Sequence, residues 1–305
     1  MPFRFPQRGG GGGLFGGGRR RAGGGLFGGR GRGGAGFGAL KIRLLIGAAI
    51  ALFVVVGYFT QTQVNPVTGQ KQRVKLDPQQ EVAMGLQSMD QMAGEFGGVS
   101  RDPAARALVE RVGRRLEAVI DDVYGVQEIP WAFSFTLLED DQTVNAFALP
   151  GGPTFITEAL FARLQTEGQL AGVIGHEIGH VLHRHGAERL ARQGLLQGLM
   201  GAATVATGDI GAAQIGRVVG GSIMMKHGRE DEIECDAEGV KLMVEAGYDP
   251  RSMIGVMEIL KDASGGASRV PEWQSSHPHP ENRAEKIEAV IAEAYPDGLP
   301  AGLTP

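Results

Sequence analysis

Sixteen consecutive residues without a charged side chain, from residue 44 to residue 59, limit what the N-terminal part of this chain can become. As a helix rising about 1.5 Å per residue, this stretch spans roughly 24 Å, slightly less than a bilayer core normally requires. Lys41 and Arg43 can reach the interface at one end, and Tyr58 can lie at the other. We therefore predict a transmembrane helix over residues 41–60, with a buried helix of a soluble domain as the alternative.

Charges are distributed unevenly on the two sides of this segment. Residues 1–43 contain nine Arg or Lys and no acidic residue, whereas the rest of the chain carries about −13 within a formal net charge of −4. A cleaved signal peptide is disfavoured, because the preceding region is long and no small-x-small cleavage site follows. The positive-inside rule then places the N-terminus in the cytoplasm and everything after Thr60 on the outer face of the membrane.

The regions on either side of this helix differ in composition from the rest of the chain. Glycine makes up 18 of the first 38 residues, so residues 1–40 cannot bury enough apolar surface to offset their conformational entropy and are predicted to be disordered. We interpret them as a flexible cytoplasmic arm; an Arg-Gly tail that binds nucleic acid is the alternative. Residues 61–80 are polar and are predicted to be a linker, followed by a globular domain over residues 81–305. The single cysteine excludes an intramolecular disulfide.

The globular part alternates between helical and extended patterns. Asp102-Pro103 predicts the start of a helix that ends near Gly125, and strands are expected over residues 131–138 and 143–149. Thr166 begins a long helix with an apolar stripe. Further helices are expected around residues 229–246, from Pro250 and from about Glu281, whereas residues 195–222 are interpreted as a mobile helical excursion that could serve as a lid.

The segment His176-Glu177-Ile178-Gly179-His180 lies within that long helix and follows the pattern H-E-x-x-H. A spacing of four residues places both imidazoles on one helix face, as two ligands of a tetrahedral zinc ion require. Glu177 flanks this face, where it can take a proton from a water and later give it to a leaving amine. The motif alone is only moderately specific, since a polar helix face can carry two histidines without binding a metal.

A catalytic zinc site also needs a third protein ligand. A histidine ten residues after the first is excluded, because that position is Gly186. His183 and His185 lie on or beside the same helix and cannot easily complete a tetrahedron around the same ion. We therefore interpret these two histidines as surface residues or as residues behind the ligands.

The remaining source of a third ligand is the acidic run over residues 230–236. Glu232 and Asp236 are four residues apart on a predicted helix, so one could bind the metal while the other orients a ligand histidine. A solvated acidic face is the alternative, and composition does not choose among these carboxylates.

Three ordered motifs resemble the family of membrane-associated zinc metallopeptidases that includes the CAAX prenyl endopeptidases, the HtpX heat-shock proteases and bacterial periplasmic relatives. The family pattern is H-E-x-x-H, then E-x-x-A-D-x-x-G on a later helix, then a His-Pro segment followed by Arg. These motifs correspond here to residues 176–180, to residues 232–239, and to Ser276-His277-Pro278 with Arg283 beyond. The resemblance covers roughly residues 62–295.

The resemblance implies one Zn²⁺ per chain and a role for each matching residue. Glu232 becomes the third zinc ligand, and Asp236 and Arg283 become residues that support the ligands from behind. His277 becomes a residue that steadies the oxyanion or that occupies the open position of the zinc in a resting state. A loop histidine beside a proline is the alternative reading of His277.

Two further expectations accompany these roles. Residues 145–152 resemble the edge strand that the family places beside the zinc, and such a strand can hold varied peptides through main-chain hydrogen bonds. Cys235 stands where the family usually has alanine, and we expect it to be a small buried residue. The residues expected to bind substrate in this way are Asn145, Ala146, Phe147 and Ala148.

Taken together, the sequence predicts an α+β fold: a mostly helical, zincin-like domain of the gluzincin type with a small sheet, preceded by one transmembrane helix. We expect a zinc metalloendopeptidase that hydrolyses misfolded or misassembled envelope proteins, without nucleic-acid binding. We place it in a bacterial inner membrane as a single-pass protein, with its catalytic domain in the periplasm; a mitochondrial inner membrane is the disfavoured alternative. The rival functions are a non-catalytic, zinc-stabilised chaperone or binding module and a nucleic-acid-binding protein that acts through its Arg-Gly arm.

Overall fold

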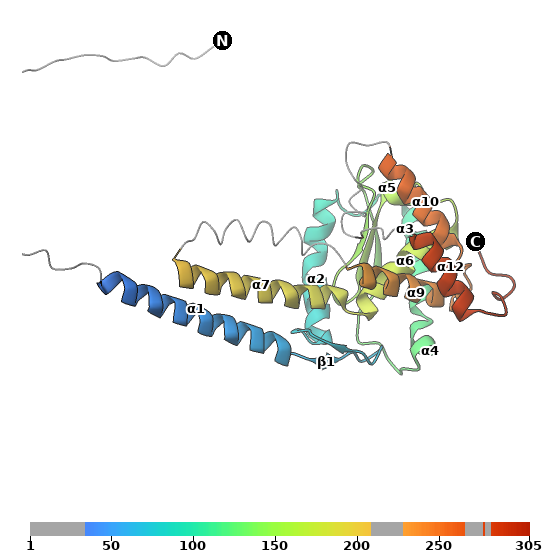
Figure 1. The fold of residues 1–305 in the computed structure, drawn as a ribbon. Helices are drawn as coiled ribbons and strands as arrows, with labels where there is room; N and C mark the ends of the chain where they lie inside the picture. The colour runs from blue at the N-terminus through green and yellow to red at the C-terminus, as the bar shows by residue number, and fades with distance from the viewer. Residues whose placement is uncertain (1–33, 209–227, 266–276, 278–281) are drawn as a thin grey trace, which may run out of the picture. The chain divides into compact units, whose positions relative to one another are not determined.

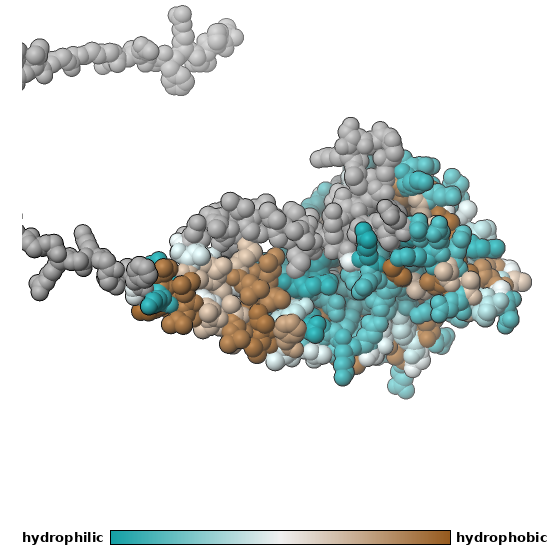
Figure 2. Space-filling view, in the orientation of Figure 1, coloured by the Kyte–Doolittle hydropathy of each residue, from teal (hydrophilic) through white to brown (hydrophobic). Residues whose placement is uncertain are grey.

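The structure is a computed structural model that describes residues 34–208, 228–265, 277 and 282–305. Its first helix, α1 (Gly34–Thr60), contains the predicted transmembrane segment. Among the described residues it is the one helix that is long and apolar enough to cross a membrane. Its hydrophobic side chains are largely exposed, Phe53 by 79%, and they gather along the helix in Figure 2. Such a surface suits a lipid environment. Residues 1–33 of the predicted tail lie outside the described part of the chain.

The segment expected to be a linker contains two short strands. These strands, β1 (Gln63–Val64) and β2 (Lys71–Gln72), pair antiparallel. Between them, Asn65 Nδ2 donates a hydrogen bond to the carbonyl of Leu182 at 2.7 Å. Because Leu182 is the last residue of helix α6 (Glu167–Leu182), the hairpin satisfies a backbone acceptor that the end of a helix leaves free.

Three helices follow, of which two replace the single helix expected up to residue 125. The first, α2 (Pro78–Glu95), is capped by Asp77. Next, α3 (Pro103–Glu117) begins at the predicted cap, where Asp102 Oδ1 accepts from the Ala104 N–H at 2.9 Å. A break at residues 118–119 separates α3 from α4 (Ile120–Tyr124), and Gly125 ends α4 in the left-handed conformation.

A three-stranded sheet, in the order β3–β5–β4, packs against α3 and α6. In this sheet β3 (Ser134–Leu138) runs parallel to β5 (Pro153–Thr157), and β4 (Ala146–Ala148) runs antiparallel to it. Every residue of β5 is buried, which explains why no alternating pattern marked this strand in the sequence. The strand expected within residues 143–149 is thus β4, and it lies at an edge of the sheet.

Helix α6 lies at the centre of the domain. Its predicted cap is confirmed, since Thr166 Oγ1 accepts from the Gln169 N–H at 3.2 Å. Every residue from Leu170 to Leu182 is buried, so this helix is enclosed by the rest of the fold. The remaining described helices are α5 (Glu158–Phe161), α7 (His185–Thr207), α9 (Arg229–Glu245), α10 (Ser252–Gly265) and α12 (Arg283–Ala294) (Figure 1).

Two glycines allow α6 and α9 to approach closely. A Cβ atom at Gly179 would lie 3.0 Å from the Cα of Cys235, and one at Gly175 would lie 3.3 Å from the Cα of Gly239. Cys235 is fully buried at this contact, as expected for a small residue in its position. The close packing brings the H-E-x-x-H face of α6 against the acidic face of α9.

The fold class predicted from the sequence is confirmed: the described residues form a mostly helical domain with a small sheet, preceded by one helix suited to a membrane. Residues 195–207 of the expected helical excursion belong to α7, whereas residues 209–222 lie outside the described part of the chain. Their role as a lid stays a prediction.

Candidate metal centre

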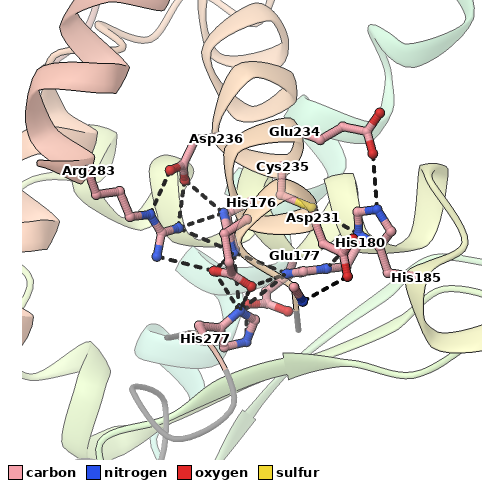
Figure 3. A network of polar contacts seen from close by, with 12 residues as sticks. His176, Glu177, His180, His185, Asp231, Glu234, Cys235, Asp236, His277 and Arg283 are labelled. Atoms are coloured by element: carbon pink, nitrogen blue, oxygen red, sulfur yellow. Dashed lines mark hydrogen bonds and ion pairs between the residues drawn. The ribbon is translucent and has the colours of Figure 1, made fainter. Parts of the chain in front are cut away.

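Four buried side chains from three parts of the chain converge at the contact between α6 and α9. His176 and His180 come from α6, Glu232 from the first turn of α9, and His277 from the segment before α12. One ligand atom of each lies within 4.8 Å of the corresponding atom of every other. Figure 3 shows the three histidines turned toward one another, although their residue numbers span about a third of the chain.

The distances between these atoms fit a tetrahedral metal ion. His176 Nε2, His180 Nε2 and His277 Nδ1 are separated by 3.2–3.3 Å. The Glu232 carboxylate oxygens lie 3.0 Å from the His277 nitrogen, 3.4 Å from that of His176 and 3.5 Å from that of His180. Four ligands about 2.05 Å from one zinc ion would be roughly 3.3 Å apart, the edge of a tetrahedron.

The electrostatics of the cluster favour a cation. Burial and the charge of Arg283 lower the pKa of His176, but hydrogen bonds with Asp236 and Glu232 outweigh them and raise it to about 9. Burial raises the pKa of Glu232, but the charge of His277 and hydrogen bonds with His176 and His180 lower it far below its usual range. Because three nitrogens face one centre, a metal ion is the cation that interacts with all of them at once.

A buried ion pair lies behind His176. Asp236 Oδ1 is 3.0 Å from His176 Nδ1, and Arg283 donates to both Asp236 oxygens at 2.6 Å. Burial raises the pKa of Asp236, but the charge and hydrogen bonds of Arg283 lower it overall. When His176 offers Nε2 to a metal, its proton lies on Nδ1 and is donated to the ionised Asp236, which orients the ring. Asp236 and Arg283 thus lie behind His176, and their support of a metal ligand stays a prediction.

Another histidine, which the sequence placed either on the surface or behind the ligands, lies behind His180. His185 Nδ1 is 2.9 Å from His180 Nδ1, and His185 Nε2 is 3.1 Å from Glu234 Oε2. Because His185 is only 3% exposed, its reading as a surface residue is wrong and its reading as a residue behind the ligands holds. The left-handed Arg184, with φ of 54°, breaks the helix and turns His185 back toward the site. No sequence signal marked this break.

Residues 107–291, more than half of the chain, match the family model described as Peptidase family M48. The chain belongs to this family. It is 30% identical over 255 residues to the beta-barrel assembly-enhancing protease of Yersinia pestis, covering 80% of the chain and 50% of that protein. It is 28% identical over 268 residues to the mitochondrial metalloendopeptidase OMA1 of Bos taurus, covering 83% of the chain and 51% of that protein. The chain thus spans about half the length of these curated relatives. The match confirms the resemblance drawn from the three motifs, and the domain is an M48 metallopeptidase domain.

Within this M48 domain, Glu177, the predicted base, is buried. Both of its carboxylate oxygens are buried, and neither has a hydrogen-bond partner among the described residues. His277 Nε2 lies 3.6 Å from Glu177 Oε1. A buried carboxylate without a partner is costly, so a water or a substrate group is the expected partner of Glu177.

The strand expected to bind substrate approaches the site from the sheet. The predicted residues Ala146, Phe147 and Ala148 form β4, and Asn145 precedes it. Ala148 and the turn that follows line a small hollow together with His180. The edge strand therefore leads toward the second histidine of the motif, and its binding of peptide main chains stays a prediction.

Proposed function

We propose that this M48 chain is a membrane-anchored zinc endopeptidase whose metal is held by His176, His180 and Glu232. The observation that carries the proposal is the tetrahedral set of ligand atoms beside the carboxylate of Glu177, which is buried and has no hydrogen-bond partner among the described residues. Imidazole and carboxylate ligands in a tetrahedral arrangement are typical of zinc. A module that only bound metal would not need a base in this position.

The residues around the site supply the rest of the chemistry. When bound, zinc would polarise the scissile carbonyl and lower the pKa of a water molecule. Glu177 takes the proton of the attacking water and later passes it to the leaving amine. Asp236 holds the ring of His176 in the orientation that presents Nε2. The edge strand β4 would align the peptide through main-chain hydrogen bonds on the side that faces away from β5.

His277 takes the fourth corner of the tetrahedron in this proposal. Its Nδ1 lies 3.2–3.3 Å from the ligand nitrogens of His176 and His180, which is the spacing of a ligand. A substrate carbonyl needs that corner, so the arrangement corresponds to a resting state from which His277 withdraws. Once displaced, its imidazole can steady the oxyanion, which is the other role considered for this residue.

The setting of the enzyme follows from the N-terminal part of the chain and from the relatives. The positive N-terminal segment favours a cytoplasmic N-terminus and a periplasmic catalytic domain, anchored in a bacterial inner membrane by α1. The similarity to a beta-barrel assembly-enhancing protease supports unfolded or misassembled envelope polypeptides as substrates. Alkaline phosphatase fused after Pro305 should be active in cells, whereas a cytoplasmic domain would leave it inactive.

The activity is tested with the full chain in detergent, wild type beside Glu177→Gln, with casein as substrate. We expect Glu177→Gln to retain zinc and to cleave casein roughly 10²–10⁴-fold more slowly, because the base is lost while the ligands remain. Glu110→Gln, the same change at an exposed residue of α3, should leave cleavage unchanged. Equal cleavage by wild type and Glu177→Gln would contradict the assignment. A wild-type chain that binds zinc and unfolded casein without cutting would favour the binding module instead.

A further inference from the structure

We infer that His185 is a positioning residue for the zinc ligand His180, and that it links this ligand to the carboxylate of Glu234 through its own imidazole ring. The inference rests on the proposed zinc site and adds to it a second series of hydrogen bonds that supports a ligand. The contacts that carry it are the 2.9 Å approach of the two Nδ1 atoms and the 3.1 Å approach of His185 Nε2 to Glu234 (Figure 3).

If His180 binds the metal, the position of each proton along the path His180–His185–Glu234 is determined. His180 offers Nε2 to the metal, so its proton is on Nδ1 and is donated to Nδ1 of His185. His185 must then be unprotonated at Nδ1 and carry its proton on Nε2, from which it donates to Glu234 Oε2. Only one tautomer of each ring satisfies this path. The negative charge at its end makes His180 a better ligand.

The backbone around residue 184 holds His185 in place. The left-handed conformation of Arg184 is unfavourable for a residue with a side chain, so other contacts must stabilise it. Arg184 is buried and donates to Glu81 Oε1 from Nε at 2.9 Å and from Nη2 at 2.6 Å. It also donates to the carbonyl of Leu76 at 2.7 Å. These bonds tie the turn between α6 and α7 to the start of the domain.

The same region offers a second interpretation, in which His180, His185 and Cys235 together hold another metal ion. Their ligand atoms lie within 4.8 Å of one another, and Cys235 Sγ is 3.4 Å from His185 Nδ1. The hydrogen-bonded path is favoured because His180 already offers Nε2 to the first ion. Binding a second ion through Nδ1, the atom that faces His185, would require the ring to lose both of its N–H protons.

His183 provides a matched control two residues away. It is buried to a similar degree, 5% exposed against 3% for His185. Its ring faces Glu234 Oε1 at 3.2 Å and Glu238 Oε2 at 3.4 Å, rather than His180. The loss of its imidazole should therefore alter packing without altering the orientation of the ligand.

The experiment compares His185→Leu, His185→Asn and His183→Leu with wild type, as full chains in detergent that show the same circular dichroism. Zinc affinity is measured by competition with a chelator, and the cobalt-substituted proteins give the spectrum of the metal site. His185→Leu should bind zinc roughly 10–100-fold more weakly, with an altered cobalt spectrum. His185→Asn should recover most of the affinity, because its Oδ1 can take the place of Nδ1 as acceptor. His183→Leu should match wild type.

The outcomes separate this inference from the function on which it rests. If wild type binds no zinc, the proposed function fails. If wild type binds one zinc and His185→Leu binds it equally well, only the inference is overturned. Equal losses for His183→Leu and His185→Leu would also overturn it, because they would indicate a general packing effect. Two zinc ions per wild-type chain, with a thiolate band in the cobalt spectrum, would overturn it in favour of the second metal site.

Discussion

The two histidines of α6 at the proposed metal site are supported by different means. Behind His176 lies an ion pair whose members, Asp236 and Arg283, come from α9 and α12 and are at most 3% exposed. Behind His180 lies a second histidine from the next helix, and the path ends at Glu234, whose side chain is 34% exposed. The support of His176 is buried and comes from segments distant in the sequence. The support of His180 begins with a residue only five positions away and ends at a partly exposed carboxylate.

This difference indicates which parts of the site depend on the whole fold. The support of His176 forms only when α12 packs beside α9, so it couples metal affinity to the stability of the domain. The support of His180 depends on the left-handed residue Arg184, which interrupts the helix four residues after the ligand. Its terminal charge is shared with water, and an interaction so exposed contributes less than a buried one.

The largest loss of zinc affinity and of stability is expected from Asp236→Asn. This change removes the charge that orients His176 and leaves Arg283 buried without its main partner. Zinc affinity should fall by about 100-fold, and the free energy of unfolding should fall by about 3 kcal/mol. Chelator competition and urea unfolding measure the two quantities, with the exposed Asp262→Asn as control. A change in affinity without a change in stability would contradict the coupling of the two.

An intermediate effect is expected from Gly179→Ala. The added Cβ would lie 3.0 Å from the Cα of Cys235, so α6 and α9 must separate beside His180. Unfolding should become easier by about 1–3 kcal/mol, as in other overpacked cores. Gly175→Ala, with its nearest neighbour at 3.3 Å, should cost less. Gly194→Ala, which meets nothing within 4 Å, should stabilise α7 by roughly 0.5–1 kcal/mol. Equal thermal unfolding of all three variants would show that the close approach of the helices is not needed.

The smallest effect is expected from Glu234→Gln. The amide still accepts from His185, and the carboxylate that it replaces is one third exposed. Zinc affinity should therefore fall by about tenfold, the lower end of the range for residues behind a ligand. Chelator competition beside the exposed neighbour Glu230→Gln checks this. If Glu234→Gln weakens zinc binding as much as Asp236→Asn, the two supports are equivalent and the comparison fails.

Local patterns predicted the elements whose residues carry their own signals. The caps at Asp102 and Thr166, the apolar stripe of α6 and the charge-free run in α1 were all visible in the sequence, because each depends on neighbouring residues. The buried strand β5 shows no alternation of apolar and polar residues in the sequence. The hairpin β1–β2 was predicted to be a linker because its residues are polar. Both are held by contacts with residues far away in the sequence.

The residues of the site likewise divide into those that local spacing predicted and those that it did not. His176, Glu177 and His180 follow from the spacing of four residues, which depends only on helix geometry. Residue spacing alone did not choose among the carboxylates of α9, and Glu232 and His277 followed only from the resemblance to a family. His185 was left among the surface or supporting residues, since its place depends on the left-handed turn at Arg184 and on the buried Glu81 that binds it.

X-ray absorption at the zinc edge of the purified full chain tests the central claim most directly. We predict one zinc per chain in a four-coordinate shell of nitrogen and oxygen at about 2.0–2.1 Å, with imidazole scattering and no sulfur. A chain without zinc would contradict the proposed metal site. A shell that includes sulfur at about 2.3 Å would contradict the ligand set of His176, His180 and Glu232 and would indicate that Cys235 binds the metal.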